Sequence, residues 1–393
     1  MNDSKSLPDI IARNLVDVPR SGIRDFFEIV SAMDDVISLG IGEPDFDAPW
    51  HIREASVYAL ERGATSYTSN LGLLKLRQAI SLYLRRTMQL DYDPATEILI
   101  AVGVSEALDL AVRAICDPGD EIMYHEPCYV SYGPLIQFAH GVPVAVPTCV
   151  DNEFRLTRAA LEERVTSKTK ALLLNYPNNP TGAGLTVEDA REIAEFVIAH
   201  DLILITDEIY AELTYEGAHQ SVAAFPGMRE RTIFLHGFSK AWAMTGFRLG
   251  YACAPAPLTD AMMKIHQYTM LCAPILSQEA AMEALKDPES DIAEMKSAYE
   301  KRRNFLLSSF AEMGLPCFKP RGAFYAFPSI QKTGMDSKTF AMELLQQERV
   351  ACVPGTAFGP SGEGFVRCSY ATSIDALKVA VERIGRFLQR NSA

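Results

Sequence analysis

Hydrophobic and polar residues alternate along this chain in two rhythms, which predict strands and helices in turn. Apolar positions recur at helical spacing in stretches such as 105–116 and 187–200. Short, almost wholly apolar runs lie between such stretches. These runs predict strands at residues 97–102, 121–124, 142–146, 171–174, 202–205 and 232–235. Apolar strands separated by helices indicate an α/β fold, with a mostly parallel sheet that helices cover on both faces.

The pattern changes after about residue 285, where a smaller α+β domain is expected. Pro44 and Pro49 mark the passage into the first large helix, so we expect the N-terminal segment to pack with this smaller domain. The sequence therefore predicts a large domain over 46–285 and a small domain built from 1–45 and 286–393. The elements predicted for the C-terminal part are a helix over 291–313, a strand at 322–325, a helix at 337–348, a strand pair near Val350 and Phe365, and a helix over 374–389.

The composition is that of a soluble globular protein. The chain has 393 residues, of which 48% are hydrophobic and 22% charged, enough for two domains. Its net charge of −13 disfavours binding to nucleic acid or to an anionic membrane. No stretch approaches the ~20 apolar residues of a membrane span, and the first residues lack the layout of a secretory signal. The eight cysteines form no CxxC pair. We therefore expect a cytoplasmic protein with buried thiols, without disulfides or a metal site.

The segment 236–251 places a lysine and an arginine among small residues. Lys240 lies in an apolar-flanked turn, where an amine loses its proton more easily and can form a Schiff base with a carbonyl group. Arg248, between two glycines, presents a planar fork that suits a phosphate. Pyridoxal phosphate carries both groups. A single lysine or arginine is more often a solvated surface charge, so this prediction depends on the motifs that follow.

Two further turns follow predicted strands and could bind the same cofactor. The turn 103–106 opens a helix, and the N–H groups of Val104 and Ser105 at such a position can bind phosphate. Ser105 could equally be a helix N-cap. The loop 175–182 would place the Asn179 amide beside the ring hydroxyl, although it could be an ordinary Asn/Pro/Gly loop. We also predict that the Asn179–Pro180 peptide bond is cis, which aims the amide inward.

Asp207 and Tyr210 follow the next apolar strand. A partly desolvated carboxylate at this place would pair with a protonated pyridine nitrogen, which makes the ring a better electron acceptor. Asp207 could otherwise be a helix N-cap or a surface carboxylate. Tyr210 would donate a hydrogen bond to the ring oxygen, or it could be a half-buried aromatic side chain.

Arg367 lies between apolar positions on a predicted strand and needs an acidic partner. A substrate α-carboxylate offers a bidentate one, and a structural salt bridge is the rival interpretation. The Gly/Pro-containing loop 38–46 could close over the substrate and donate a backbone N–H from Gly42.

Taken in order, these motifs resemble those of a class I, fold-type I pyridoxal-phosphate aminotransferase, of the subgroup that includes the prokaryotic aspartate and aromatic enzymes. The resemblance covers roughly residues 20–390. It implies a large domain built on a mostly parallel, seven-stranded-type sheet and a smaller α+β domain. The motifs are residues 42–46, Tyr67, 103–105, 178–182, 207–210, 239–240, 246–248 and Arg367.

The resemblance also implies a role for each candidate residue. Lys240 carries the cofactor as a Schiff base, and Asp207 holds the ring nitrogen. Asn179 and Tyr210 contact the ring hydroxyl. Three residues are implied to contact the phosphate: Val104, Ser105 and Arg248.

Other positions match the family less closely. Tyr129 stands where the ring-stacking residue is often tryptophan, and a phenol can still stack. Gly237 replaces a serine that is common in relatives, so Ser239 is the candidate for the missing phosphate-binding hydroxyl. Tyr67 would reach the phosphate bound by the neighbouring subunit, which implies a homodimer with shared sites. After Gly103 no lysine or arginine is available to bind a side-chain carboxylate.

The predicted reaction is a ping-pong transamination between an L-amino acid and a 2-oxo acid, with 2-oxoglutarate as the expected acceptor. Lys240 moves the α-proton, while Arg367 and Asn179 fix the substrate carboxylate. The apolar and aromatic character of Ile41, Tyr129 and residues 267–270 favours an aromatic or broad, aspartate-type donor.

Three other functions are less favoured. A β-lyase acting on sulfur amino acids would use the same lysine and aspartate, and it stays open at this stage. A cofactor-sensing regulator would need an added DNA-binding segment and a basic patch. A nicotinamide oxidoreductase is disfavoured because no GxGxxG opens the first strand–helix turn.

Overall fold

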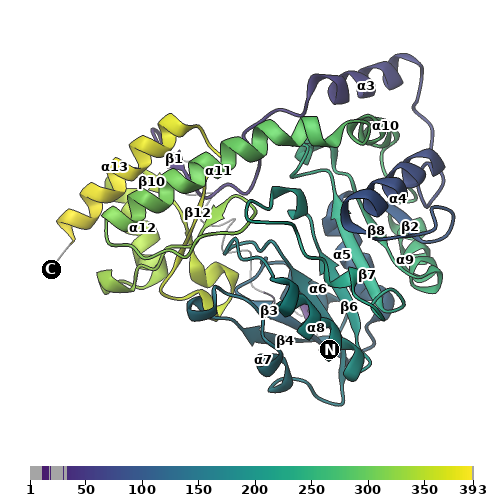
Figure 1. Ribbon diagram of the computed structural model, residues 1–393, viewed down its shortest axis with the longest axis horizontal. Helices are drawn as coiled ribbons and strands as arrows, with labels where there is room; N and C mark the ends of the chain where they lie inside the picture. The colour runs from purple at the N-terminus through teal and green to yellow at the C-terminus, as the bar shows by residue number, and fades with distance from the viewer. Residues whose placement is uncertain (1–10, 17, 19–29, 31–32, 392–393) are drawn as a thin grey trace, which may run out of the picture.

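A computed structural model describes residues 11–16, 18, 30 and 33–391, and a seven-stranded sheet lies at its centre (Figure 1). Strand β8 runs antiparallel to both of its neighbours, whereas the other six strands are parallel to one another. The α/β fold with a mostly parallel sheet is thus confirmed. In spatial order the strands are β2 (Ile98–Ala101), β8 (Gly250–Cys253), β7 (Thr232–Gly237), β6 (Ile203–Asp207), β5 (Thr169–Asn175), β3 (Glu121–Glu126) and β4 (Val142–Pro147).

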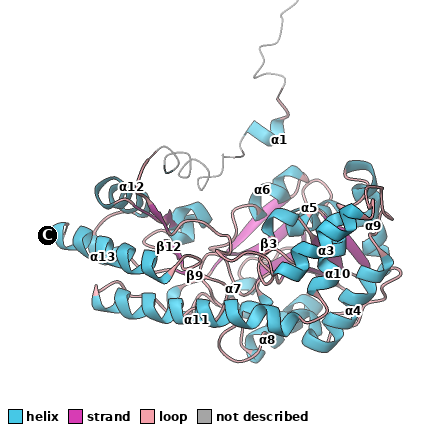
Figure 2. Ribbon diagram, turned by 90° about the horizontal axis from the view of Figure 1, so that it is seen from above, coloured by secondary structure: helices cyan, strands magenta, loops and turns pink. Residues whose placement is uncertain are grey.

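Helices cover the sheet on both faces, which explains why its strands are apolar at successive positions. Figure 2 shows α5 and α6 on one side of the sheet and α7 and α8 on the other. In β5, Leu173 packs into the core beneath α5, while Leu172 and Leu174 pack into the core beneath α8. The covering helices are α5 (Gly103–Ile115), α6 (Tyr132–Phe138), α7 (Arg158–Glu162), α8 (Val187–Ala199) and α9 (Ala256–Thr269).

Four more helices lie at the β2 edge of the sheet or begin near it. Helices α3 and α10 lie side by side there (Figure 1). The next helix along the chain, α11, is long and runs from beside α10 to the C-terminal part of the chain. These helices are α3 (Trp50–Glu61), α4 (Leu74–Met88), α10 (Ile275–Ala284) and α11 (Pro288–Glu312).

Two small sheets lie in the C-terminal part, and one of them includes a strand from the N-terminal segment. Strand β12 pairs antiparallel with β11 and β9, and β10 pairs in parallel with β1 near the start of the described chain. The strand predicted at 322–325 begins only at Tyr325. The elements are β1 (Ile37–Ser38), β9 (Tyr325–Ala326), α12 (Ser337–Glu348), β10 (Val350–Ala351), β11 (Val353–Pro354), β12 (Val366–Ser369) and α13 (Ile374–Arg390), with a short α1 (Arg13–Val16).

The boundaries of the two domains stay a prediction. The pairing of β1 with β10 agrees with an N-terminal segment that packs beside the C-terminal part, but residues 1–10, 17, 19–29 and 31–32 lie outside the described residues. All eight cysteines are free thiols. The prediction that they are buried is wrong for Cys149, which is exposed just before a turn of 3₁₀ helix, and Cys116, Cys272 and Cys317 are only partly buried. In the described part of the chain, no helix has the length and apolar character needed to cross a membrane.

Candidate active site

A cavity of about 380 Å³ opens where the parallel strands of the large sheet end. Strands β5, β6 and β7 lead into it, as does the turn between β2 and α5. It brings together nearly all of the predicted site residues. Tyr67 is the exception, because it is absent from the lining and its side chain is 82% exposed. The predicted residues that line the cavity are Gly42, Val104, Ser105, Tyr129, Asn179, Asp207, Tyr210, Ser239, Lys240, Arg248 and Arg367.

Asp207 ends strand β6 and is buried in the cavity wall. Its Oδ2 accepts a hydrogen bond from the Tyr132 hydroxyl at 2.9 Å, and its Oδ1 accepts one from the Ile209 N–H at 3.3 Å. Burial raises the pKa of Asp207 to about 6, although both hydrogen bonds oppose this shift. Asp207 is therefore neither a surface carboxylate nor a helix N-cap. It is a buried acid that stays ionised at neutral pH and can hold a cation.

Lys240 follows strand β7 and extends into the same cavity. Its Nζ donates to the Gly42 carbonyl oxygen at 2.7 Å and lies 5.9 Å from the ring centroid of Tyr210. Burial lowers the pKa of Lys240 to about 8. Glu43 opposes this shift, while the positive charge of Arg367 adds to it. About a tenth of the amine is therefore neutral and nucleophilic at pH 7, far more than for an exposed lysine.

Arg248 lies against the first turn of α5, which makes this corner suitable for an anion. Its Nη1 donates to the Thr245 carbonyl oxygen at 3.0 Å, and it forms no ion pair within the described residues. Gly103 has a φ of +78°, and a Cβ there would lie 2.8 Å from Arg248 Nη2, so only glycine permits this approach. The N-cap of α5 is Val102, without a side-chain cap, so Ser105 is not the N-cap. The amides of this turn stay available to a phosphate.

Close packing explains the glycine at position 237, where the family resemblance led us to expect a serine. A Cβ at this position would come within 2.9 Å of Gly250 Cα and 3.0 Å of Val104 Cγ2. Strands β7 and β8 and the start of α5 therefore meet too closely here for a larger residue. Ser239 is buried and lines the cavity two residues later, and its contact with a phosphate stays a prediction.

Arg367 is buried on β12, but no carboxylate among the described residues pairs with it, so the salt-bridge interpretation is wrong. Its Nη1 donates to Asn179 Oδ1 at 2.8 Å and its Nη2 to the Gly40 carbonyl oxygen at 2.5 Å. The guanidinium lies between two aromatic rings, 4.6 Å from Tyr325 and 4.8 Å from Phe358. Its Nε is buried without a partner in the described part of the chain. An arginine left in this state fits a substrate anion.

The loop that carries Asn179 is held from both sides. The Asn175 side chain donates to the Asp207 carbonyl oxygen at 2.8 Å and accepts from the Asn179 N–H at 3.0 Å. The Asn179–Pro180 bond is cis, as predicted. Asn179 is buried beside Arg367, so this is more than an ordinary surface loop.

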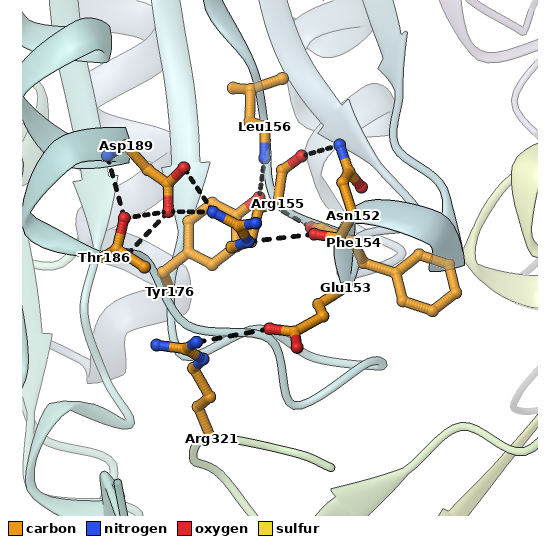
Figure 3. A network of polar contacts seen from close by, with 9 residues as sticks. All are labelled: Asn152, Glu153, Phe154, Arg155, Leu156, Tyr176, Thr186, Asp189 and Arg321. Carbon is orange, nitrogen blue, oxygen red and sulfur yellow. Dashed lines mark hydrogen bonds and ion pairs between the residues drawn. The ribbon is translucent and has the colours of Figure 1, made fainter. Parts of the chain in front are cut away.

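Behind this loop, a second polar network fixes Tyr176 (Figure 3). The Tyr176 hydroxyl donates to the Phe154 carbonyl oxygen at 3.1 Å and accepts from the Leu156 N–H at 3.0 Å. Arg155, next to both, donates to the two Asp189 carboxylate oxygens at 2.7 and 2.8 Å. The loop thus starts from a rigid anchor.

Sequence reasoning did not single out three residues of this region. Tyr325 lines the cavity, and its hydroxyl lies 2.9 Å from that of Tyr210. Tyr132 packs edge to face on Tyr129, with centroids 5.7 Å apart, and bonds Asp207. Asn175 had a usable signal, because it ends an apolar strand beside the strand that Asp207 ends. Tyr132 and Tyr325 had none, since tertiary packing brings them to the site.

Comparisons with known proteins agree with this geometry. The family model for aminotransferases of class I and II matches residues 34–384. The chain is 55% identical to the putative aminotransferase YugH of Bacillus subtilis, over 95% of this chain and 96% of that protein. It is 44% identical to aromatic-amino-acid aminotransferase 2 of Thermococcus litoralis, over 94% and 96%.

Solved structures of aminotransferases are also similar to this fold over nearly the whole chain. The aromatic aminotransferase from Pyrococcus horikoshii superposes with a TM-score of 0.90 at 46% identity, over 94% of this chain and 99% of that one. The aspartate aminotransferase from Thermus thermophilus with maleate superposes with a TM-score of 0.92 at 36% identity, over 96% and 99%.

Proposed function

This chain belongs to the family of class I and II aminotransferases, and we propose on that premise that it moves an amino group between an L-amino acid and a 2-oxo acid with pyridoxal phosphate held at Lys240. The family match also confirms the resemblance and the fold type expected from the motifs. One observation carries the proposal for this site. The Lys240 amine, the Asp207 carboxylate and the Arg367 guanidinium line a single cavity.

The residues present fit pyridoxal phosphate. Asp207 is a buried acid that accepts two hydrogen bonds and forms no ion pair among the described residues, which suits a pyridinium nitrogen. Arg248 and the open amides of Val104 and Ser105 suit the phosphate. Ring contacts are proposed for Tyr129, Asn179 and Tyr210, and a phosphate contact for Ser239. When bound, the cofactor supplies a carbonyl carbon for amine exchange and a ring that withdraws electrons from the substrate α-carbon.

The protein's own groups then perform three tasks. Lys240, with a pKa lowered to about 8 by burial, takes the α-proton as a neutral amine and returns it. Arg367 and Asn179 hold the substrate carboxylate, so the C–H bond to be broken stays in a fixed direction. Tyr210 and Asp207 hold the two ends of the ring. Because the same groups serve the amino acid and the oxo acid, we expect ping-pong kinetics, with 2-oxoglutarate as acceptor.

The cations in the cavity favour an aromatic or broad donor. Among the described residues, the cationic side chains that line the cavity are Lys240, Arg248 and Arg367. Each already has a proposed partner: the cofactor carbonyl, the phosphate and the substrate α-carboxylate, respectively. A side-chain carboxylate would find no further cation among the described residues of the lining. Of the donor contacts expected from the sequence, Tyr129 lines the cavity, whereas Tyr268 is 87% exposed and lies outside it.

We also propose a homodimer in which Tyr67 reaches the partner's phosphate site. Tyr67 is exposed, as are Trp50 and Tyr58 on the neighbouring helix α3. The loop after Tyr67 lies against the segment that follows α9, because Asn70 donates to the Leu271 carbonyl oxygen at 2.7 Å. Exposed aromatic residues over several elements are typical of an interface. Sedimentation should give twice the chain mass.

The cytoplasmic location stays a prediction.

A half-reaction screen tests the proposed function. The protein loaded with pyridoxal phosphate is mixed with phenylalanine, tyrosine, aspartate or glutamate, without an acceptor. We expect one equivalent of 2-oxo acid and loss of the bound cofactor's visible absorbance, with continued turnover only after 2-oxoglutarate is added. Repeated release of ammonia and pyruvate from a sulfur amino acid would instead indicate the β-lyase, which no observation on this chain favours.

A further inference from the structure

Tyr325 contacts three proposed functional residues of the cavity, namely Gly42, Tyr210 and Arg367. Its side chain is fully buried at the start of β9. Its hydroxyl is 2.9 Å from the Tyr210 hydroxyl, and its ring lies 4.6 Å from the Arg367 guanidinium carbon. A Cβ on Gly42 would lie 2.7 Å from the Tyr325 hydroxyl oxygen. Because Gly42 has no side chain, the Tyr325 hydroxyl fits beneath its loop. The carbonyl oxygen of the same residue accepts the hydrogen bond from Lys240.

The two hydroxyl groups share one hydrogen bond, and either could be the donor. If Tyr210 donated to Tyr325, the Tyr210 proton would point away from the cofactor ring. The proposed role of Tyr210 requires that proton in the cavity. A hydroxyl group carries one proton and two lone pairs, so Tyr210 can serve the ring oxygen only if it accepts from Tyr325.

We propose that Tyr325 is a positioning residue, which donates its hydroxyl proton to Tyr210 and so directs the Tyr210 proton toward the cofactor's ring oxygen. This inference rests on the proposed function. Tyr325 does not touch the reacting atoms through its hydroxyl group and acts through Tyr210. A hydrogen bond received by Tyr210 also makes its own proton a stronger donor, because linked hydrogen bonds polarise one another.

Charged and polar groups face this pair of tyrosines from several elements. Arg367 faces both rings from β12, and Lys240 lies 5.9 Å from the Tyr210 ring centroid. Burial and, less strongly, the charge of Asp207 on β6 raise the pKa of Tyr210. Burial and, less strongly, the neighbouring Tyr129 raise the pKa of Tyr325. Burial raises the pKa of both tyrosines, so each hydroxyl keeps its proton at neutral pH. The pair therefore carries two protons, and the question is only their direction.

The test is a pH titration of the bound cofactor's visible absorbance. A hydrogen bond donated to the ring oxygen stabilises the unprotonated cofactor–lysine linkage. Tyr325→Phe should therefore raise the titration midpoint by about 0.5 to 1 pH unit, as expected for one hydrogen bond. Tyr210→Phe should raise it by at least as much. The matched control is Tyr370→Phe, which removes a buried hydroxyl that bonds the Ala323 carbonyl oxygen outside the cavity lining. It should leave the midpoint unchanged.

A double variant shows whether Tyr325 acts through Tyr210. In the Tyr210→Phe background, the further change Tyr325→Phe should not move the midpoint, because the group it orients is gone. An equal rise in both backgrounds would overturn the proposal. So would a midpoint in Tyr325→Phe that equals the wild-type value or falls below it, the latter meaning that Tyr210 donates to Tyr325.

The titration separates this inference from the proposed function. If the wild-type protein forms no absorbing linkage with pyridoxal phosphate, the proposed function fails before any variant is compared. If the wild type titrates and Tyr325→Phe behaves like Tyr370→Phe, only the inference fails. Thermal unfolding of each variant shows whether it is folded, and removal of the single hydroxyl oxygen keeps the ring packing in place.

Discussion

Two polar regions of this molecule, one half-buried and the other buried around the cavity, differ in how fully their hydrogen bonds are satisfied. Around Tyr176, the carboxylate of Asp189 accepts bonds from Arg155 and from the backbone and side chain of Thr186 (Figure 3). In the cavity, Arg367 is buried with no acidic partner among the described residues, and its Nε is free.

The charge states differ in the same way. Burial acts against ionisation of Asp189, but its bonds from Arg155 and Thr186 hold its pKa below the ordinary value. In the cavity, burial prevails, raising the pKa of Asp207 to about 6 and lowering that of Lys240 to about 8. A saturated network stabilises the fold, whereas unmet bonding capacity at a cavity indicates a ligand site.

The largest effect is expected for Lys240→Ala. Without the amine, nothing binds the cofactor covalently or moves the α-proton, so kcat should fall by about four orders of magnitude or more. Steady-state transamination measures this loss. Lys264→Ala, on the exposed face of α9, is the control and should keep wild-type activity. Multiple turnover retained in Lys240→Ala would place the chemistry elsewhere.

Arg367→Ala should lower kcat/KM for amino acids by about 10²- to 10³-fold, as expected when a buried charge loses its partner. Simple alkylamines lack the carboxylate, so their slower reaction with the loaded protein should change little. A loss of the same size for both substrates would mean that Arg367 supports the cavity wall and does not bind the carboxylate.

The reaction of cofactor-free protein with pyridoxal phosphate should depend on pH. Only the neutral amine reacts, and burial lowers the pKa of Lys240 to about 8. The rate should therefore rise about tenfold per pH unit below this value and level off above it. Stopped-flow absorbance gives the profile, with butylamine as the reference for titration of the aldehyde. A profile still rising at the pH where an exposed lysine titrates would contradict the depressed pKa.

The smallest effect on activity is expected for Asp189→Ala, which breaks the saturated network. The free energy of unfolding should fall by about 2–3 kcal/mol, since Arg155 and Thr186 lose their shared partner. Activity at a temperature where the variant is folded should stay within a few-fold of wild type. Asp201→Ala removes an exposed partner of Arg231 and should cost under about 1 kcal/mol. Equal unfolding midpoints for the two variants would contradict the claim that the Asp189 network stabilises the fold more than an exposed ion pair does.

Much of the fold follows from the sequence, because apolar strands and amphipathic helices are local patterns. The exception in the large sheet is β8, a short Gly-Tyr-Ala-Cys run whose insertion between β2 and β7 is set by tertiary contacts. In the site, Asp207 ends one strand and Asn179 follows its neighbour in the sheet, so position along the chain reveals both residues.

Residues brought in from distant segments were harder to find. Tyr132 and Tyr325 approach Asp207 and Tyr210 from 75 and 115 residues away, respectively, and no local pattern marks such contacts. The proposed role of Tyr67 requires a second subunit, and both the role and the homodimer stay predictions.

The most direct test of the central claim is to find the residue that carries the cofactor. The protein loaded with pyridoxal phosphate is reduced with borohydride, digested and mapped by mass spectrometry. We expect a single pyridoxyl label on Lys240, absent from Lys240→Ala. A label on another lysine, or no label on a folded and loaded protein, would contradict the assignment of this cavity as the aminotransferase active site.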